Sequence, residues 1–244
     1  MKIRKYHLLI CCFLLLSCFN DTDDVLTGTL SSYTKGVNIE LGAVIACASS
    51  DEITNEILTF YYPEAGAKNV RFYETSSIEV NPNEFLNYKQ IFLESEPFFN
   101  GYLGKFTQAS ATEKWIIITF ELNDEIKISN PIRTKQITKP TIWTNDVLIS
   151  TLDPLMPNFS WEDNPFGDNA IYFQIISDIQ NNLLSGTYTL ENNFQYYNTN
   201  NVVLNITTQN PPALITKTKY NFTLMDVSED NWVNWVVQKS FDTK

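Results

Sequence analysis

The sequence predicts an all-β protein made of two β-sandwich domains that follow a separate N-terminal segment. Short apolar stretches alternate with polar residues, and Asn, Asp, Pro and Thr interrupt them at short intervals. Aromatic residues make up 14% of the chain, and Ile, Val and Thr are plentiful, which suits half-buried strands. The part that follows the N-terminal segment has about 200 residues, which is enough for two ordinary domains.

The N-terminal segment, residues 1–17, has the pattern of a signal peptide. Lys2, Arg4 and Lys5 give it a basic start, and an apolar run follows from Tyr6 to Leu16. A membrane-spanning helix needs about 20 apolar residues, so this run of 11 is too short to span. A short apolar run behind a basic start is typical of a segment that is removed on export.

The run ends in Leu-Leu-Ser-Cys at residues 15–18, which resembles the bacterial lipobox. That resemblance implies cleavage after Ser17, acylation of Cys18 and a membrane partner reached through the lipid anchor. Several acyl chains give stable anchoring without a spanning helix. We expect residues 18–36, which are polar and rich in Ser, Thr and Asp, to form a flexible, lipidated tether.

An acidic cluster follows the lipobox cysteine at Asp21, Asp23 and Asp24. It is similar to the export tags that send some Gram-negative lipoproteins to the outer face of the outer membrane. The resemblance implies an outer-membrane protein that is exposed at the cell surface. A charge run of this kind is also typical of a plain solvated tail.

Loss of the signal peptide removes several kinds of chemistry. The only histidine, His7, leaves with it, so Ser-His-Asp and Cys-His catalysis lack their base and the chain is predicted not to be an enzyme. The net charge falls from −11 to about −14, which excludes a nucleic-acid partner. After cleavage, two cysteines remain, Cys18 and Cys47. The apolar residues around Cys47 predict a buried side chain rather than a reactive thiol.

Residues 37–139 are predicted to form the first sandwich. Its clearest element is a hairpin, in which residues 114–122 and 125–129 are strands joined by a turn at Asn123-Asp124. Trp115 is expected in the core. The other predicted strands are residues 37–47, 57–62, 70–74, 90–93 and 102–107.

Residues 140–244 are predicted to form the second sandwich, with Trp143 at the seam between the two domains. Residues 157–161 end in Trp161 and are similar to the second strand of fibronectin type III-like domains, which share the immunoglobulin-like sandwich. Leu214, Thr218 and Tyr220 have the spacing of that family's tyrosine corner. The resemblance implies a core built on Trp161, Leu214 and Tyr220. The hairpin of the first domain could take the same late positions in a related fold.

Acidic loops are the candidate ligand sites. The loop at residues 162–169 contains Asp163 and Asp168, and a second acidic turn contains Asp226 and Glu229. Such oxygen-rich loops suit Ca²⁺, although neither has the spacing of an EF-hand and either could be a solvated turn. No other metal or cofactor is expected.

The sequence therefore predicts a membrane-anchored, surface-exposed lipoprotein that acts as a non-catalytic binding or scaffold module for an unknown protein or glycan partner. The alternative is a glycan-binding accessory lipoprotein. Trp232 and Trp235 lie three residues apart, so in a strand they face opposite sides and one of them is expected outside the core. An exposed indole near Tyr196 and Tyr197 could stack on sugars, whereas edge packing would make both indoles structural.

Overall fold

The computed structural model describes residues 28–153, 155–162, 168–207 and 210–244. The signal peptide, Cys18 and the acidic cluster behind it lie outside the described residues. The prediction of an all-β sandwich fold is confirmed: one five-residue α-helix, α2 (Leu30–Thr34), and one 3-10 turn, η1 (Phe85–Asn87), accompany the strands in the described part of the chain. No helix among these residues is long and apolar enough to cross a membrane.

Residues 39–133 form a sandwich of two sheets. Sheet A has the strand order β1 (Ile39–Val44), β9 (Glu125–Ser129), β8 (Trp115–Leu122), β4 (Lys68–Glu74) and β5 (Lys89–Ile91), with β10 (Ile132–Arg133) also paired to β8. Sheet B has the order β2 (Ala46–Ser50), β3 (Ile57–Tyr61), β7 (Leu103–Gln108) and β6 (Glu96–Phe98).

Residues 142–242 form a second sandwich. Sheet C has the order β11 (Ile142–Thr144), β19 (Val233–Asp242), β18 (Lys219–Ser228), β14 (Asn169–Asp178), β15 (Leu183–Thr189) and β17 (Val202–Asn205). Sheet D has the order β12 (Leu148–Ser150), β13 (Asn158–Ser160) and β16 (Asn193–Gln195).

The two sandwiches share one topology. The order β1-β9-β8-β4-β5 in sheet A matches β11-β19-β18-β14-β15 in sheet C, and β2-β3-β7 in sheet B matches β12-β13-β16 in sheet D. The first strand is parallel to the last in both larger sheets, as β1 is to β9 and β11 is to β19. The fold is therefore repeated within the chain, although the sequence has no residue-level repeat that would reveal it.

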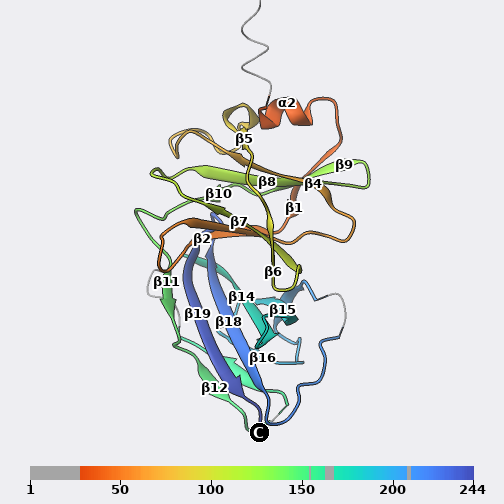
Figure 1. The fold of residues 1–244 in the computed structure, drawn as a ribbon, viewed down its shortest axis with the longest axis vertical. Coiled ribbons are helices and arrows are strands. Elements are labelled where there is room, and N and C mark those ends of the chain that lie inside the picture. The colour runs from red at the N-terminus through yellow and green to blue at the C-terminus, as the bar shows by residue number, and fades with distance from the viewer. Residues whose placement is uncertain (1–27, 154, 163–167, 208–209) are drawn as a thin grey trace, which may run out of the picture.

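Apolar layers fill the spaces between the sheets and cover the outer face of sheet A. In Figure 1, β8 of sheet A lies across the long axis, whereas β18 and β19 of sheet C run along it. One layer fills the first sandwich between sheets A and B, and another fills the second between sheets C and D. A third lies between the outer faces of sheets B and C. The outer face of sheet A is covered by α2 and by the segment around η1.

The α2 helix corrects part of the predicted tether. Thr29 caps it by accepting a 3.1 Å hydrogen bond from the N–H of Ser32, and the Leu30 N–H donates to the Tyr88 carbonyl at 3.0 Å. The Leu30 side chain is fully buried among Tyr73 and the isoleucines of sheet A. The prediction of a flexible tether is therefore wrong for residues 29–34, because their apolar side chains cover a sheet face that would otherwise contact water.

Two further expectations can be compared with the strands. The single strand predicted over residues 37–47 is two strands, β1 and β2, which belong to different sheets; the register of β1 with β9 shifts between Leu41 and Val44, around Gly42 at a φ of +71°. The hairpin prediction is confirmed, because β8 and β9 pair and the φ angles of Asn123 and Asp124 are 54° and 61°. Two positive φ angles in a row are what a tight type I′ turn requires.

Candidate functional site

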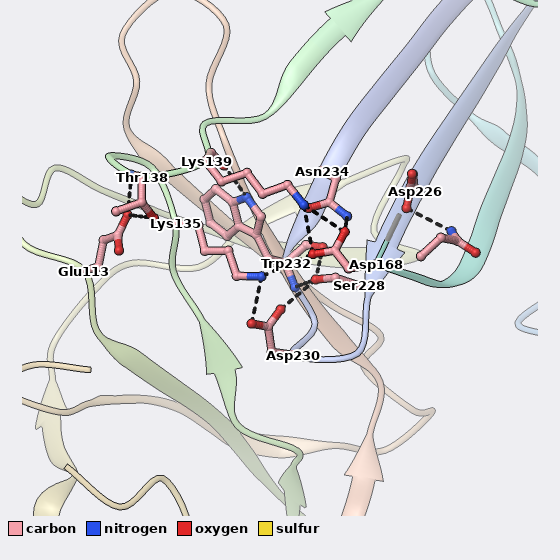
Figure 2. Close-up of polar contacts among 11 residues, drawn as sticks. Glu113, Lys135, Thr138, Lys139, Asp168, Asp226, Ser228, Asp230, Trp232 and Asn234 are labelled. Atoms are coloured by element: carbon pink, nitrogen blue, oxygen red, sulfur yellow. Dashed lines mark hydrogen bonds and ion pairs between the residues drawn. The ribbon is translucent and has the colours of Figure 1, made fainter. Parts of the chain in front are cut away.

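The most elaborate polar site lies at the junction of the two sandwiches, around the turn between β18 and β19 (Figure 2). Trp232 at the end of this turn belongs to the second half of the chain, but its side chain is fully buried in the core of the first sandwich, in one cluster with Ile57, Phe106 and Ile132. Its indole N–H donates to the Lys139 carbonyl at 2.9 Å. A buried indole needs such a partner, and here the linker between the sandwiches supplies it.

Backbone hydrogen bonds join the same turn to the first sandwich. The N–H of Ala48 in β2 donates to the Asn231 carbonyl at 3.0 Å, and the N–H of Arg133 in β10 donates to the Asp230 carbonyl at 3.0 Å. The Asn231 side-chain amide donates to the Pro131 carbonyl at 3.1 Å. The turn is therefore bonded to two strands of the first sandwich.

The linker itself is held by reciprocal hydrogen bonds. The Ser50 N–H donates to Thr141 Oγ1 and the Thr141 N–H donates to Ser50 Oγ, both at 2.8 Å, while Thr141 Oγ1 donates to the Val233 carbonyl at 2.8 Å. The Trp143 indole N–H donates to the Ser50 carbonyl at 3.0 Å, and its ring packs in the layer between sheets B and C. Trp143 thus packs at the seam between the sandwiches.

A buried carboxylate fixes the start of the linker. Glu113 is 8% exposed, and its Oε1 accepts hydrogen bonds from the N–H of Ile137 at 3.1 Å, the N–H of Thr138 at 2.6 Å and the hydroxyl of Thr138 at 2.8 Å (Figure 2). Three donors to one carboxylate oxygen are the arrangement that makes a buried charge tolerable.

Charged side chains complete the junction (Figure 2). Lys139 donates to both carboxylate oxygens of Asp168 at 2.8 Å, Lys135 lies 2.8 Å from Asp230, and Asn234 donates to Asp168 at 2.7 Å. Burial alone would raise the pKa of Asp168, but the hydrogen bond and charge of Lys139, with the charge of Lys135, outweigh it and hold the pKa below its usual value.

An apolar layer accompanies these polar contacts. Phe60, Phe99 and Leu103 of the first sandwich pack with Phe173 and Met225 of sheet C. The β6–β7 hairpin reaches toward sheet C and carries Phe99 and Leu103 onto it (Figure 1). Hydrogen bonds, ion pairs and apolar packing therefore all join the two sandwiches at this junction.

The predicted core residues of the second sandwich lie in its central layer. Trp161 is 5% exposed and packs edge-on against Tyr172, with ring centroids 5.2 Å apart. Tyr220 is the second residue of β18, and its hydroxyl accepts a hydrogen bond from the Ile215 N–H at 3.0 Å. Leu214 is buried beside them. This is the geometry of a tyrosine corner.

Trp115 occupies a different kind of position in the first sandwich. It begins β8 and is half-buried, packing against the layer beneath α2 rather than between the two sheets. Its indole N–H donates to the Ile78 carbonyl at 3.1 Å.

The candidate calcium residues are separated. Asp163 lies outside the described residues, and Asp168 is held by two ammonium groups whose positive charge opposes a bound cation. Asp226 is fully buried and accepts a 2.8 Å hydrogen bond from Asn169, whereas Glu229 is exposed in the junction turn. Among the described residues, no three side chains of the metal-binding types come together.

The aromatic residues considered for sugar stacking are mostly buried. Trp232 is in the core, and Trp235 packs beside the second core while its N–H donates to Thr144 Oγ1 at 2.9 Å. Within the described ranges, Phe92 and Tyr197 are the only exposed aromatic side chains. Tyr196, next to Tyr197, is fully buried. A row of exposed indoles is therefore missing from the described surface.

No family model matches the chain, and no curated protein matches it. The chain is similar to one solved in a study of the structural basis of neurohormone perception by the receptor tyrosine kinase Torso, at 14% identity and a TM-score of 0.26, covering 85% of this chain and 76% of that one. It is also similar to the fibronectin(III)-like modules of Clostridium thermocellum CbhA, at 10% identity and a TM-score of 0.24, covering 86% and 92%. The fold assignment rests on the strand order and the cores described above.

Sequence reasoning missed the junction as a site. Its residues come from five separate segments, around residues 48–50, 113, 130–143, 168 and 228–234, and no motif connects them. One signal was available in β3, where Ile57, Leu58, Phe60 and Tyr61 put apolar side chains on both faces, as is typical of a strand covered on both sides.

Proposed function

We propose that the chain is a membrane-anchored, surface-exposed lipoprotein that acts as a non-catalytic scaffold or binding module. The lipobox at residues 15–18 supports the anchor, and the acidic cluster behind Cys18 supports export to the cell surface. The loss of the only histidine with the signal peptide supports a role without general-base catalysis by imidazole.

The many contacts across the junction are the observation that supports the scaffold role. Two sandwiches held at one angle by Trp232, the linker and the ion pairs form a spacer whose far end keeps a defined position. Residues 30–34 lie at one end of the long axis and the C-terminus lies at the other (Figure 1). An anchor on the N-terminal side would therefore present the second sandwich away from the membrane, where a partner could reach it.

The anchor is tested by Cys18→Ala in a Gram-negative host. Wild-type protein should be recovered with the membrane fraction and should incorporate labelled fatty acid. The Cys18→Ala variant should lose the label and shift to the soluble or unprocessed pool. Cys12→Ala is the matched control, because Cys12 lies inside the apolar run and should leave both properties unchanged.

Protease treatment of intact cells tests exposure at the surface separately. Cleavage by added protease supports the surface location, provided that a periplasmic marker stays intact. Protection of the protein in intact cells, followed by cleavage after the outer membrane is opened, would contradict it. If the wild-type protein incorporated no labelled fatty acid, or if Cys18→Ala kept the label, the lipoprotein proposal would be wrong.

A further inference from the structure

A cavity of about 310 Å³ lies beside the junction, between the outer faces of sheets B and C. Phe60 and Leu103 form part of its wall on the first sandwich, and Phe173 and Tyr188 form part of its wall on the second. Leu204 of β17 lies at its rim, where the side chain is 41% exposed. The cavity is thus built from two sandwiches and opens at the edge of sheet C.

The lining is uncharged. None of the described residues that line the cavity is Asp, Glu, Lys, Arg or His, although charged residues make up 18% of the chain. Its titratable groups are also held neutral: burial raises the pKa of the Cys47 thiol to about 12 and raises the pKa of the Tyr188 hydroxyl well above its usual value. A charged ligand group in this space would lose its water without gaining an ionic partner.

The size of the cavity limits the ligand further. An apolar cavity of about 150 Å³ binds benzene, and pockets for small molecules start at about 300 Å³. Ligand sites also occur preferentially between domains. The cavity therefore has room for two fused rings or for an alkyl chain of about eight to ten carbons.

We propose that the cavity is a binding site for a neutral, apolar small molecule, such as a medium-length alkyl alcohol or a bicyclic aromatic compound. Bound there, the molecule touches both sandwiches and adds apolar contacts to the junction. It binds the folded protein in preference to the unfolded chain, so it raises the unfolding temperature, and the rise grows with the logarithm of the ligand concentration above the Kd. This site is independent of the anchor and of the scaffold role.

Titration calorimetry of the folded chain, residues 28–244, with 1-octanol and with indole tests the site. We expect saturable binding with one site and a Kd of about 1 mM or tighter. Octanoate has the same chain length but is ionised at pH 7, so it should bind at least about ten-fold more weakly than 1-octanol. Failure of both neutral probes to saturate, or equal affinity for octanoate, would overturn the proposal.

Leu204→Trp and Val203→Trp form the matched pair of variants. Leu204 lines the cavity, whereas Val203, its neighbour on β17, does not line it and is 55% exposed. Filling the rim with Leu204→Trp should weaken 1-octanol binding about ten-fold or more, and Val203→Trp should leave it within about two-fold. Equal affinity in the two variants would place the bound probe elsewhere and overturn the site.

A direct measurement covers the case in which Leu204→Trp does not fold. Nuclear Overhauser effects from the octanol methylenes to the methyl groups of Leu103, Ile171 and Val227 would connect the probe to both walls of the cavity. Contacts to exposed methyl groups such as those of Leu152, without any to these three, would overturn the assignment.

Discussion

The two sandwiches have the same strand order, but the outer faces of their smaller sheets are opposite in character. Leu58 and Phe60 on the outer face of sheet B pack into the layer shared with sheet C. The equivalent face of sheet D carries Asn158, Ser160 and Gln195, which alternate with the buried Phe159 and Phe194. One smaller sheet is therefore built to be covered on both faces, and the other is built to contact water on one.

The two larger sheets, A and C, resemble each other in that the outer face of each is covered. Each has an outer face that needs a cover: α2 and the η1 segment cover sheet A, and the first sandwich covers sheet C. The outer faces of both larger sheets are thus covered, that of sheet A by segments of its own half of the chain and that of sheet C by the other sandwich.

The largest expected effect comes from the residue that crosses between the two regions. Trp232→Ala should destabilise the first sandwich by about 3–5 kcal/mol, because it leaves a cavity in that core. It also leaves the Lys139 carbonyl without its indole donor. Chemical denaturation, followed by probes in each sandwich, should show the first half unfolding earlier than the second.

Trp161→Ala makes the corresponding change in the core of the second sandwich, and Trp235→Ala is the control at a half-buried tryptophan. Trp161→Ala should weaken the second sandwich by a similar amount, and Trp235, which is only half-buried, should give a smaller loss. If Trp232→Ala destabilised only the second sandwich, its place in the first core would be wrong.

The contrast between sheets B and D is sharpened by one matched pair of substitutions. Leu58→Asn puts an amide into the layer between the sandwiches and should lower the free energy of unfolding by about 2 kcal/mol or more. Leu148→Asn, on the outer face of sheet D where the side chain is 76% exposed, should change it by no more than about 0.5 kcal/mol. Equal losses in thermal or chemical denaturation would remove the distinction between the two faces.

Among the described residues, only the second sandwich has a tyrosine corner. Tyr220→Phe should lower the stability of that sandwich by about 1–3 kcal/mol, because the Ile215 N–H loses its acceptor while the ring keeps its packing. Tyr88→Phe in the first sandwich is the comparison. It removes a hydroxyl that donates to the Pro82 carbonyl at 2.8 Å, and since Pro82 is partly exposed, water can replace that donor and the loss should be smaller.

The smallest effect concerns the ion pairs at the junction. The folded-state pKa of Asp168 is lowered, so its contribution to stability is present above the unfolded pKa of about 3.9 and is lost as the pH falls through the lower folded value. Because the Asp168 side chain is 39% exposed, solvent screening limits the contribution to less than about 1 kcal/mol. Asp168→Asn should lower the unfolding free energy slightly at pH 7 and leave it nearly unchanged at pH 2. A larger difference at pH 2 than at pH 7 would contradict this sign.

Part of the molecule could be predicted from local patterns. The β8–β9 hairpin followed from Asn123-Asp124 between two alternating stretches, since turn chemistry and strand period act within a few residues. The spacing of Trp232 and Trp235 predicted that one of them lies outside the core, but Trp232 precedes β19 and is buried in the first sandwich, and Trp235 packs against the core of the second. The order of residues 29–34 was also missed, because a short polar segment becomes ordered only when a sheet face is there to bury Leu30.

By itself, the sequence determined the fold class and the β8–β9 hairpin, because strand period and turn chemistry are set by neighbouring residues. Only the tertiary structure decided that the two halves share a topology, that Trp232 leaves its own sandwich for the other, and that an uncharged cavity lies between them. These features depend on contacts between residues up to about 180 positions apart. The free energy of such contacts comes from apolar area that is buried between two surfaces. Local sequence patterns do not show which surfaces meet, because that depends on the folded chain as a whole.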